Sequence, residues 1–505
     1  MQESRVKNSV RSTIAGSANK FVTMLFPFIT RTIIIKELGI DYIGLNGLFS
    51  SILSVLSISE LGFGSAMVYS MYKPVAEGNT DKICALLKQY KKIYQRVGLF
   101  ILAAGLCLLP FLDHFISGTY PDDVNLTVLY LLYLFNSVIS YFIFSYKGSI
   151  LSATQREDVN SNILMITNIG MYVFQIIILF TVKKYMAYIV VMPIMTIANN
   201  IIRSIVVDKM YPQYKCEGSL SKEELHAIYK NVSALVGHRI SGTIILSADN
   251  IVISAVLGLT AVACYGNYYY IVNALVGFFM IYFNAIRPSI GNSIVTESIE
   301  KNYKDFRKIT LITAWIAGWC SICLLCLFQP FIKLWVGEEY LLSLGVVVIL
   351  SFYFYEWKLI DVFVVYRDAA GMWWSDRFRP YVVAVLNIVG NITLVYFMGL
   401  EGVVLSTLFT SFLISFPWVL RVLFKEYFKS HMREYCRYLF KISFVVIVTA
   451  VITYGITCLV PSTGILNFIV KITICIIAPN LIFLVTLGRL KEFRDIKNMI
   501  IKGKL

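Results

Sequence analysis

A small set of ionisable side chains lies within stretches of the sequence that are otherwise apolar. Charged groups are costly inside a bilayer, where they usually face a cavity or a charged partner. They are therefore the first candidates for a binding or transport role. The set comprises Lys20, Arg31, Glu60, His238, Arg239, Asp249, Arg287, Glu356, Lys358 and Asp361.

The spacing of the basic members predicts two polar helix faces. Lys20 and Arg31 are eleven residues apart, about three helical turns, so they share one face. Arg239 and Asn250 have the same separation, and an offset of 219 aligns this second pair with the first. A cavity lined by these side chains, with Arg287 at the inner end of a later helix, would suit an anion, most naturally a phosphate or diphosphate.

Structural roles are open for some of these groups. Lys20 can extend along its helix towards water instead of facing a cavity. Lys358 and Asp361 are spaced i, i+3, as in a structural ion pair, although they could also serve gating or ion coupling.

The acidic residues Glu60 and Asp249 each have two possible roles. Either could bind a coupling proton or Na⁺. Glu60 could instead bond to neighbouring backbone or cap a helix break before Gly62. Asp249 could instead pair with His238, eleven residues earlier on the same face, or with Arg239.

The composition indicates the class of protein that contains these groups. Of 505 residues, 58% are hydrophobic and only 15% are charged, and the mean hydropathy is +0.71. Soluble domains average about 45–50% apolar and about 25% charged residues. A soluble enzyme, a secreted disulfide scaffold and a disordered regulator are excluded, and a polytopic membrane protein is predicted.

The hydropathy pattern predicts an all-α fold of about fourteen transmembrane helices. With the N-terminus in the cytoplasm, the inner loops and tails hold roughly 36 of the 45 Lys and Arg residues, which fits the positive-inside rule. Both termini are therefore predicted to be cytoplasmic, and the net charge of +15 needs no nucleic acid partner. The predicted spans are 12–36, 43–71, 94–116, 125–147, 161–182, 185–207, 231–257, 260–287, 309–332, 340–366, 380–398, 401–421, 441–460 and 465–488.

Three inner stretches, 77–96, 297–308 and 425–440, have the amphipathic pattern of short helices that lie on an anionic membrane surface. We expect each of them to anchor the protein at the inner leaflet.

An internal repeat divides the chain. Similar residues close matching spans at offsets of about 214 to 220: Lys36-Glu37-Leu38-Gly39 and Ala255-Val256-Leu257-Gly258, Lys73-Pro74 and Arg287-Pro288, Tyr146-Lys147 and Tyr366-Arg367. We predict two pseudo-symmetric six-helix bundles, 1–215 and 225–425, followed by a linker, a helical hairpin and a tail at 426–505. Parallel repeats are typical of carriers that bind substrate between the halves near the midplane.

Motifs for enzymatic chemistry do not occur in the sequence. It has no HExxH, GxSxG or acidic metal motif and no phosphate-binding P-loop. We therefore expect no enzyme activity, no metal, no cofactor and no direct use of ATP.

Several motifs resemble those of the Wzx-like polysaccharide flippases, in the multidrug/oligosaccharidyl-lipid/polysaccharide (MOP) exporter superfamily. The similarity covers most of residues 1–425. The motifs are SELGFGSA at 59–66, YKPVAEG at 72–78, DNIVIS at 249–254, YGNY at 265–268 and YRDAAGM at 366–372, with Asp376, Arg377, Pro380 and Asn387.

The resemblance implies a V-shaped pair of bundles in a bacterial inner membrane. Such proteins move undecaprenyl-diphosphate-linked oligosaccharides from the inner to the outer leaflet by alternating access, for capsule, exopolysaccharide or O-antigen synthesis. Their cationic cavities fit Arg31 and Arg239, a Na⁺ or H⁺ gradient can drive relatives, and glycosyltransferases and a polymerase are expected partners besides the lipid bilayer.

Two other functions are alternatives to flipping. A cation-coupled multidrug exporter of the same superfamily would need an acidic, aromatic cavity, whereas the polar faces here carry Lys and Arg. A membrane polymerase or acyltransferase would need a large outer catalytic loop, and the predicted outer loops reach only roughly a dozen residues. The glycan carried, the coupling ion, the oligomeric state and the favoured conformation do not follow from the sequence.

Overall fold

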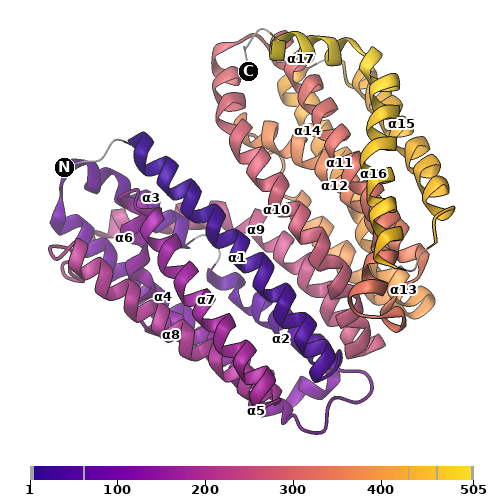
Figure 1. Ribbon diagram of the computed structural model, residues 1–505. Coiled ribbons are helices and arrows are strands. Elements are labelled where there is room, and N and C mark those ends of the chain that lie inside the picture. The colour runs from indigo at the N-terminus through magenta and orange to yellow at the C-terminus, as the bar shows by residue number, and fades with distance from the viewer. Residues whose placement is uncertain (1–4, 61–62, 430, 462–463, 502–505) are drawn as a thin grey trace. The chain divides into compact units, whose positions relative to one another are not determined.

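The computed structural model describes residues 5–60, 63–429, 431–461 and 464–501, including all their side chains except those of residues 5–10, 59, 227, 229–241, 500 and 501. This part of the chain is helical and contains no strand (Figure 1). The α-helices are α1 (Arg5–Glu37), α2 (Asp41–Leu56), α3 (Phe63–Glu77), α4 (Thr80–Cys107), α5 (Leu126–Phe142), α6 (Gly148–Ala153), α7 (Glu157–Thr181), α8 (Tyr185–Met210), α9 (Lys222–Leu257), α10 (Leu259–Thr296), α11 (Ile299–Trp335), α12 (Leu344–Ala369), α13 (Arg379–Thr410), α14 (Phe416–Leu423), α15 (Met432–Cys458), α16 (Ile465–Thr486) and α17 (Lys491–Ile501). The short 3₁₀ segments are η1 (Ser57–Glu60), η2 (Leu109–Phe115), η3 (Ser145–Lys147), η4 (Glu338–Tyr340) and η7 (Leu487–Arg489), and the π-helical segments are η5 (Ser411–Ser415) and η6 (Phe424–Phe428).

The chain folds into two compact units, Met1–Ala263 and Cys264–Leu505. The predicted division at residues 215–225 falls earlier, in the segment that leads into α9. The predicted six-plus-six repeat remains a prediction.

Polar side chains begin several of these helices. The side-chain oxygens of Asn79, Asn125, Ser298 and Ser343 each accept a hydrogen bond from a backbone N–H in the first turn of the helix that follows. Ser221 forms a full capping box with Glu224 at the start of α9.

The capping box also ties α9 to a neighbouring helix. Lys82 of α4 lies 2.7 Å from the carboxylate of Glu224, and its hydrogen bond holds the pKa of that carboxyl below its ordinary value. Residues 82 and 224 therefore join two helix starts within the first unit.

The first unit brings α2 close to the start of α10. A Cβ atom at Gly44 would lie 2.2 Å from the backbone oxygen of Leu259, so only glycine allows this approach. Asp41 accepts a hydrogen bond from Thr260 at 2.5 Å beside this contact. The glycine therefore fixes how α2 packs within the first unit.

In the second unit, α11 is the central helix. It packs against α12, α15, α16 and α17. At one end of the helix, the ring of Phe306 contacts those of Tyr366, Phe428 and Tyr435, at centroid distances of 4.9, 5.1 and 4.8 Å. These aromatic contacts join α11 to α12, the π-helical segment η6 and α15.

Eight helices among the described residues are long and apolar enough to cross a membrane, or up to ten if each of two bent pairs is one span. Each of the fourteen predicted ranges lies largely on helix, but the span predicted at 43–71 is divided into α2, η1 and α3. The two spans predicted at 380–398 and 401–421 meet at Gly399, whose φ of 57° interrupts α13. The multi-pass membrane class is confirmed, and the count of fourteen remains a prediction.

Two of the predicted surface helices are not separate elements. The stretch 77–96 forms mainly the first part of α4, and 297–308 forms the first part of α11. Their polar starts continue directly into apolar helix, and the predicted anchoring role of these stretches remains a prediction.

Candidate functional site

Arg31 is held by contacts within the first unit. It lies near the end of α1, is half-buried, and its Nη2 donates a hydrogen bond to the backbone oxygen of Ala263 at 3.1 Å. Its charge also acts on the hydroxyls of Tyr185 and Tyr188 of α8. The guanidinium is therefore hydrogen-bonded to α10, and its charge is felt by tyrosines of α8.

The other members of the predicted polar faces lie in different surroundings. Lys20 is exposed on α1, whereas Asp249 on α9 is buried and has interaction partners. Asn250 donates a hydrogen bond to the hydroxyl of Ser51 at 2.9 Å, which joins α9 to α2. The side-chain amide of Asn250 therefore contributes to the packing of α9 against α2 within the first unit.

The side chains of His238 and Arg239 lie outside the described part of the structure. Their predicted roles, including the cationic pair of Arg239 with Arg31, remain predictions.

Glu60 is the centre of a cluster with tyrosines. It ends the 3₁₀ segment η1, and its Oε1 accepts a hydrogen bond from Tyr94 at 2.8 Å. Its Oε2 accepts a short hydrogen bond from Tyr141, and Tyr90 donates to the hydroxyl of Tyr94 at 2.8 Å. The sequence had suggested backbone or capping partners, and the structure places tyrosines of α4 and α5 around the carboxylate.

Arg203 is not among the candidates predicted from the sequence, because it lies near the inner end of the span predicted at 185–207. It is buried in α8, and a Cβ atom on Gly148 would lie 3.2 Å from its Cδ. Its charge interacts with Glu157 and with Tyr94 of the Glu60 cluster. Arg203 is therefore a further buried cation of the first unit, and charges within a membrane helix usually face a cavity or a charged partner.

In the second unit, Lys358 and Asp361 form the ion pair that their spacing suggested. Their charged atoms are 2.6 Å apart, and the Lys358 side chain is almost fully buried. The ammonium lies 3.9 Å from the centre of the Trp357 ring. Arg287 of α10 is exposed, and its charge acts on Asp361.

The motif residues after α12 hold a turn together. Asp376 is fully buried and accepts hydrogen bonds from Arg367 and, at 2.8 Å, from Arg379. Asn387 donates to Thr407 at 2.9 Å within the kinked helix α13. The structure therefore gives these residues a scaffolding role.

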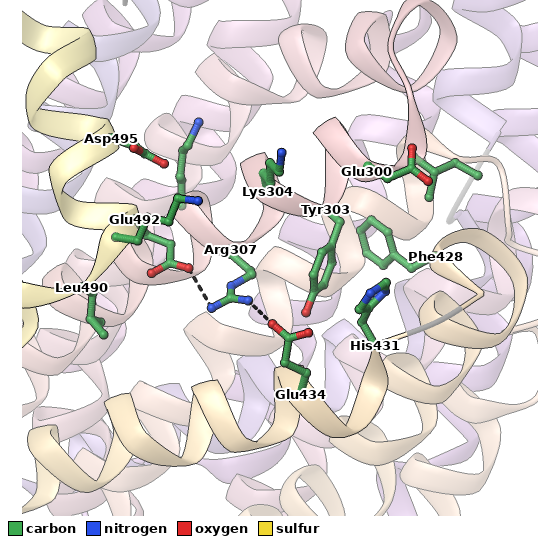
Figure 2. Close-up of a pocket in the computed structure, with 13 residues that line it drawn as sticks. Glu300, Tyr303, Lys304, Arg307, Phe428, His431, Glu434, Leu490, Glu492 and Asp495 are labelled. Atoms are coloured by element: carbon green, nitrogen blue, oxygen red, sulfur yellow. Dashed lines mark hydrogen bonds and ion pairs between the residues drawn. The ribbon is translucent and has the colours of Figure 1, made fainter.

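A cavity of about 550 Å³ lies at one end of the second unit, between α11, α15 and α17 (Figure 2). Arg307 is its central group. The guanidinium lies 2.7 Å from Glu492, forms a short ion pair with Glu434, and sits over the Tyr438 ring at 4.4 Å. Acidic and basic side chains line the cavity together, which does not favour a polyanionic ligand.

Three comparisons relate this chain to known proteins. A family model described as "Polysaccharide biosynthesis protein" matches residues 9–294. An uncharacterized membrane protein of Methanocaldococcus jannaschii is 22% identical over 417 residues, covering 76% of this chain and 78% of the relative.

The solved structures that resemble this fold are transporters. The lipid II flippase MurJ, in an inward closed conformation, matches with a TM-score of 0.68 at 15% identity, over 94% of this chain and 98% of MurJ. An inward-facing multidrug resistance transporter of the MATE family, in the MOP superfamily, matches with a TM-score of 0.62 at 14% identity, over 80% of this chain and 94% of that protein. The fold is that of MOP-superfamily membrane transporters. The family model covers more than half of this chain, and the chain therefore belongs to the polysaccharide biosynthesis protein family.

Proposed function

We propose that this protein is a flippase that moves undecaprenyl-diphosphate-linked oligosaccharide repeat units from the inner to the outer leaflet of a bacterial plasma membrane. The observation that carries the proposal is the fixed guanidinium of Arg31 within an apolar helix of a polysaccharide biosynthesis protein. Both chain ends face the cytoplasm in this proposal. Glycosyltransferases would supply the substrate and a polymerase would consume it.

The chemistry of the proposed substrate suits the residues. Guanidinium binds phosphate oxygens through paired, charge-assisted hydrogen bonds, so Arg31 and Arg239 are proposed to hold the diphosphate. Lys20 and Arg287 are exposed and are proposed to supply further positive charge near the path, with Asn250 as a polar contact. Alternating access of the two units would then move the headgroup without breaking a covalent bond, so no enzymatic step is proposed.

Loss of either arginine tests this proposal. We expect Arg31→Ala and Arg239→Ala to reduce surface polysaccharide at least about tenfold in a flippase-null strain, because the diphosphate loses a charged partner. Arg31→Lys should restore part of the activity, since it retains the charge but not the paired donors. The measurement is surface polysaccharide relative to the amount of membrane-inserted protein.

Arg433→Ala is the matched control, because Arg433 is exposed at the start of α15. It should support normal polysaccharide levels. Normal levels in either Arg31→Ala or Arg239→Ala would contradict the proposed role of the cations.

Multidrug export is the second candidate, because the fold also matches a MATE-family transporter. An exporter of this kind would pump cationic dyes out of cells and so lower their accumulation. Lipid-linked oligosaccharide would not be its substrate and would not compete with the dyes for transport. Dye efflux measured in the same strain therefore separates the two functions.

A further inference from the structure

A second cavity opens on the side of the second unit, between α12, the π-helical segment η5 with α14, and α15. Its volume is about 290 Å³. Phe440 and Phe444 at its edge are 73% and 57% exposed, which places the opening on the apolar flank of the unit. The aromatic residues that line it are Phe352, Tyr355, Phe412, Phe416, Phe440 and Phe444.

One acidic side chain lines this apolar cavity. Glu356 is 2% exposed, and its Oε2 accepts a hydrogen bond from Ser411 at 2.7 Å. Its Oε1 is buried and has no hydrogen-bond partner among the described residues. A buried carboxyl oxygen without a donor is costly, so the position would be stabilised by a ligand that supplies one.

The backbone beside Glu356 has an unusual geometry. Ser411, which donates to Glu356, begins the π-helical segment η5, and Phe412 of the same segment lines the cavity. π-helical turns are rare and occur frequently at functional sites. The local geometry is therefore a second sign, independent of the unpaired oxygen, that the cavity binds a ligand.

We propose that this cavity binds a lipophilic organic cation, with an amino or ammonium group donating to Oε1 of Glu356 and the apolar part packed among the aromatic rings. No Lys, Arg or His occurs among the described residues that line it, so no side chain there would repel a cation. Aromatic faces attract cations, most strongly where water is excluded. None of the residues proposed to hold the diphosphate lines this cavity, and binding there goes beyond the flipping function.

Binding of ethidium, a lipophilic cation with amino donors, to the purified full-length protein in nanodiscs tests the proposal. We expect saturable fluorescence enhancement with the wild type, and affinity at least about tenfold lower for Glu356→Gln, which keeps the side-chain shape and removes the charge. Ile447→Trp should also abolish binding, because it fills the cavity and leaves the carboxyl in place. Glu401→Gln, an acid of the same unit outside the cavity lining, is the control and should bind as the wild type does.

Competition distinguishes a cation site from a site for neutral lipids. Dodecylammonium should displace ethidium, and dodecanol, which has the same chain without the charge, should not. Equal ethidium affinity of folded wild type and Glu356→Gln would overturn the proposal. Equal competition by the alcohol would overturn the cationic class of the ligand.

Discussion

The ionisable side chains within the helices differ in whether their partners are near or far in sequence. Lys358 and Asp361 form the ion pair that was one reading of their spacing, because a separation of three residues places them on the same helix face. The tyrosine partners of Glu60 were not expected, because Tyr94 and Tyr141 are 34 and 81 residues away. These tyrosines come close to Glu60 only through helix packing, which cannot be predicted from a single sequence.

The Glu60 cluster leads to a prediction about ion coupling. Each carboxylate oxygen of Glu60 accepts a hydrogen bond from a tyrosine hydroxyl. Protonation of the carboxyl would turn one of these oxygens into a hydrogen-bond donor and so disturb its bond to the tyrosine. Glu60→Gln places an amide N–H donor opposite a tyrosine O–H donor, so one hydrogen bond is lost. We expect this variant to flip about tenfold more slowly and to show no response to a pH gradient. Flipping of lipid-linked oligosaccharide into proteoliposomes, with and without an imposed gradient, measures both effects.

Glu77→Gln serves as the control for this experiment, because Glu77 is exposed at the end of α3. It should flip at the wild-type rate in both conditions. A full gradient response in Glu60→Gln would show that this carboxyl is not the coupling group.

At the scale of the elements, the sequence predicted where helices occur better than where they break. Each span predicted from hydropathy lies largely on helix. A helix break before Gly62 followed from the sequence only as one of two readings of Glu60, and the structure divides the span predicted at 43–71 into α2, η1 and α3. Breaks of this kind depend on packing around polar groups such as Glu60.

The close approach of α2 to the start of α10 leads to a stability prediction. Gly44→Val would place its Cβ within 2.2 Å of the Leu259 oxygen, so the two helices must separate. We expect a loss of about 1–3 kcal/mol, as for overpacked cores. Thermal unfolding of the purified protein measures the loss.

Gly455→Ala is a suitable comparison, because no neighbouring atom lies within 4 Å of its added Cβ. It should leave the unfolding temperature unchanged or raise it, since alanine favours helix. If Gly44→Val unfolds at the same temperature as Gly455→Ala, the close contact is not tight in solution.

At the scale of the whole molecule, composition and charge were sufficient for the class of protein. The all-α membrane fold and the polysaccharide biosynthesis protein family are confirmed, and the fold resembles that of MOP-superfamily transporters. Orientation in the membrane rests on charge distribution alone. The glycan of the proposed substrate could not be predicted, because recognition through many weak polar contacts leaves no local sequence pattern.

Orientation can be measured with single cysteines in a variant whose ten native cysteines are replaced. Asp122 in the α4–α5 connection and Glu217 in the α8–α9 connection are both exposed, and the charge pattern places them on opposite sides. We expect Asp122→Cys to react with a membrane-impermeant maleimide in intact cells, and Glu217→Cys to react only after the membrane is opened. Labelling of Glu217→Cys in intact cells would reverse the predicted topology.

The ion pairs of Arg307 have a consequence for how the protein is made. Arg307 enters the ribosome tunnel 185 residues before Glu492, the second acid that neutralises it. During synthesis Glu434 emerges before Glu492, so both acids are available to Arg307 only after α17 has been made. Premature termination before α17 would therefore leave Arg307 with Glu434 but without Glu492.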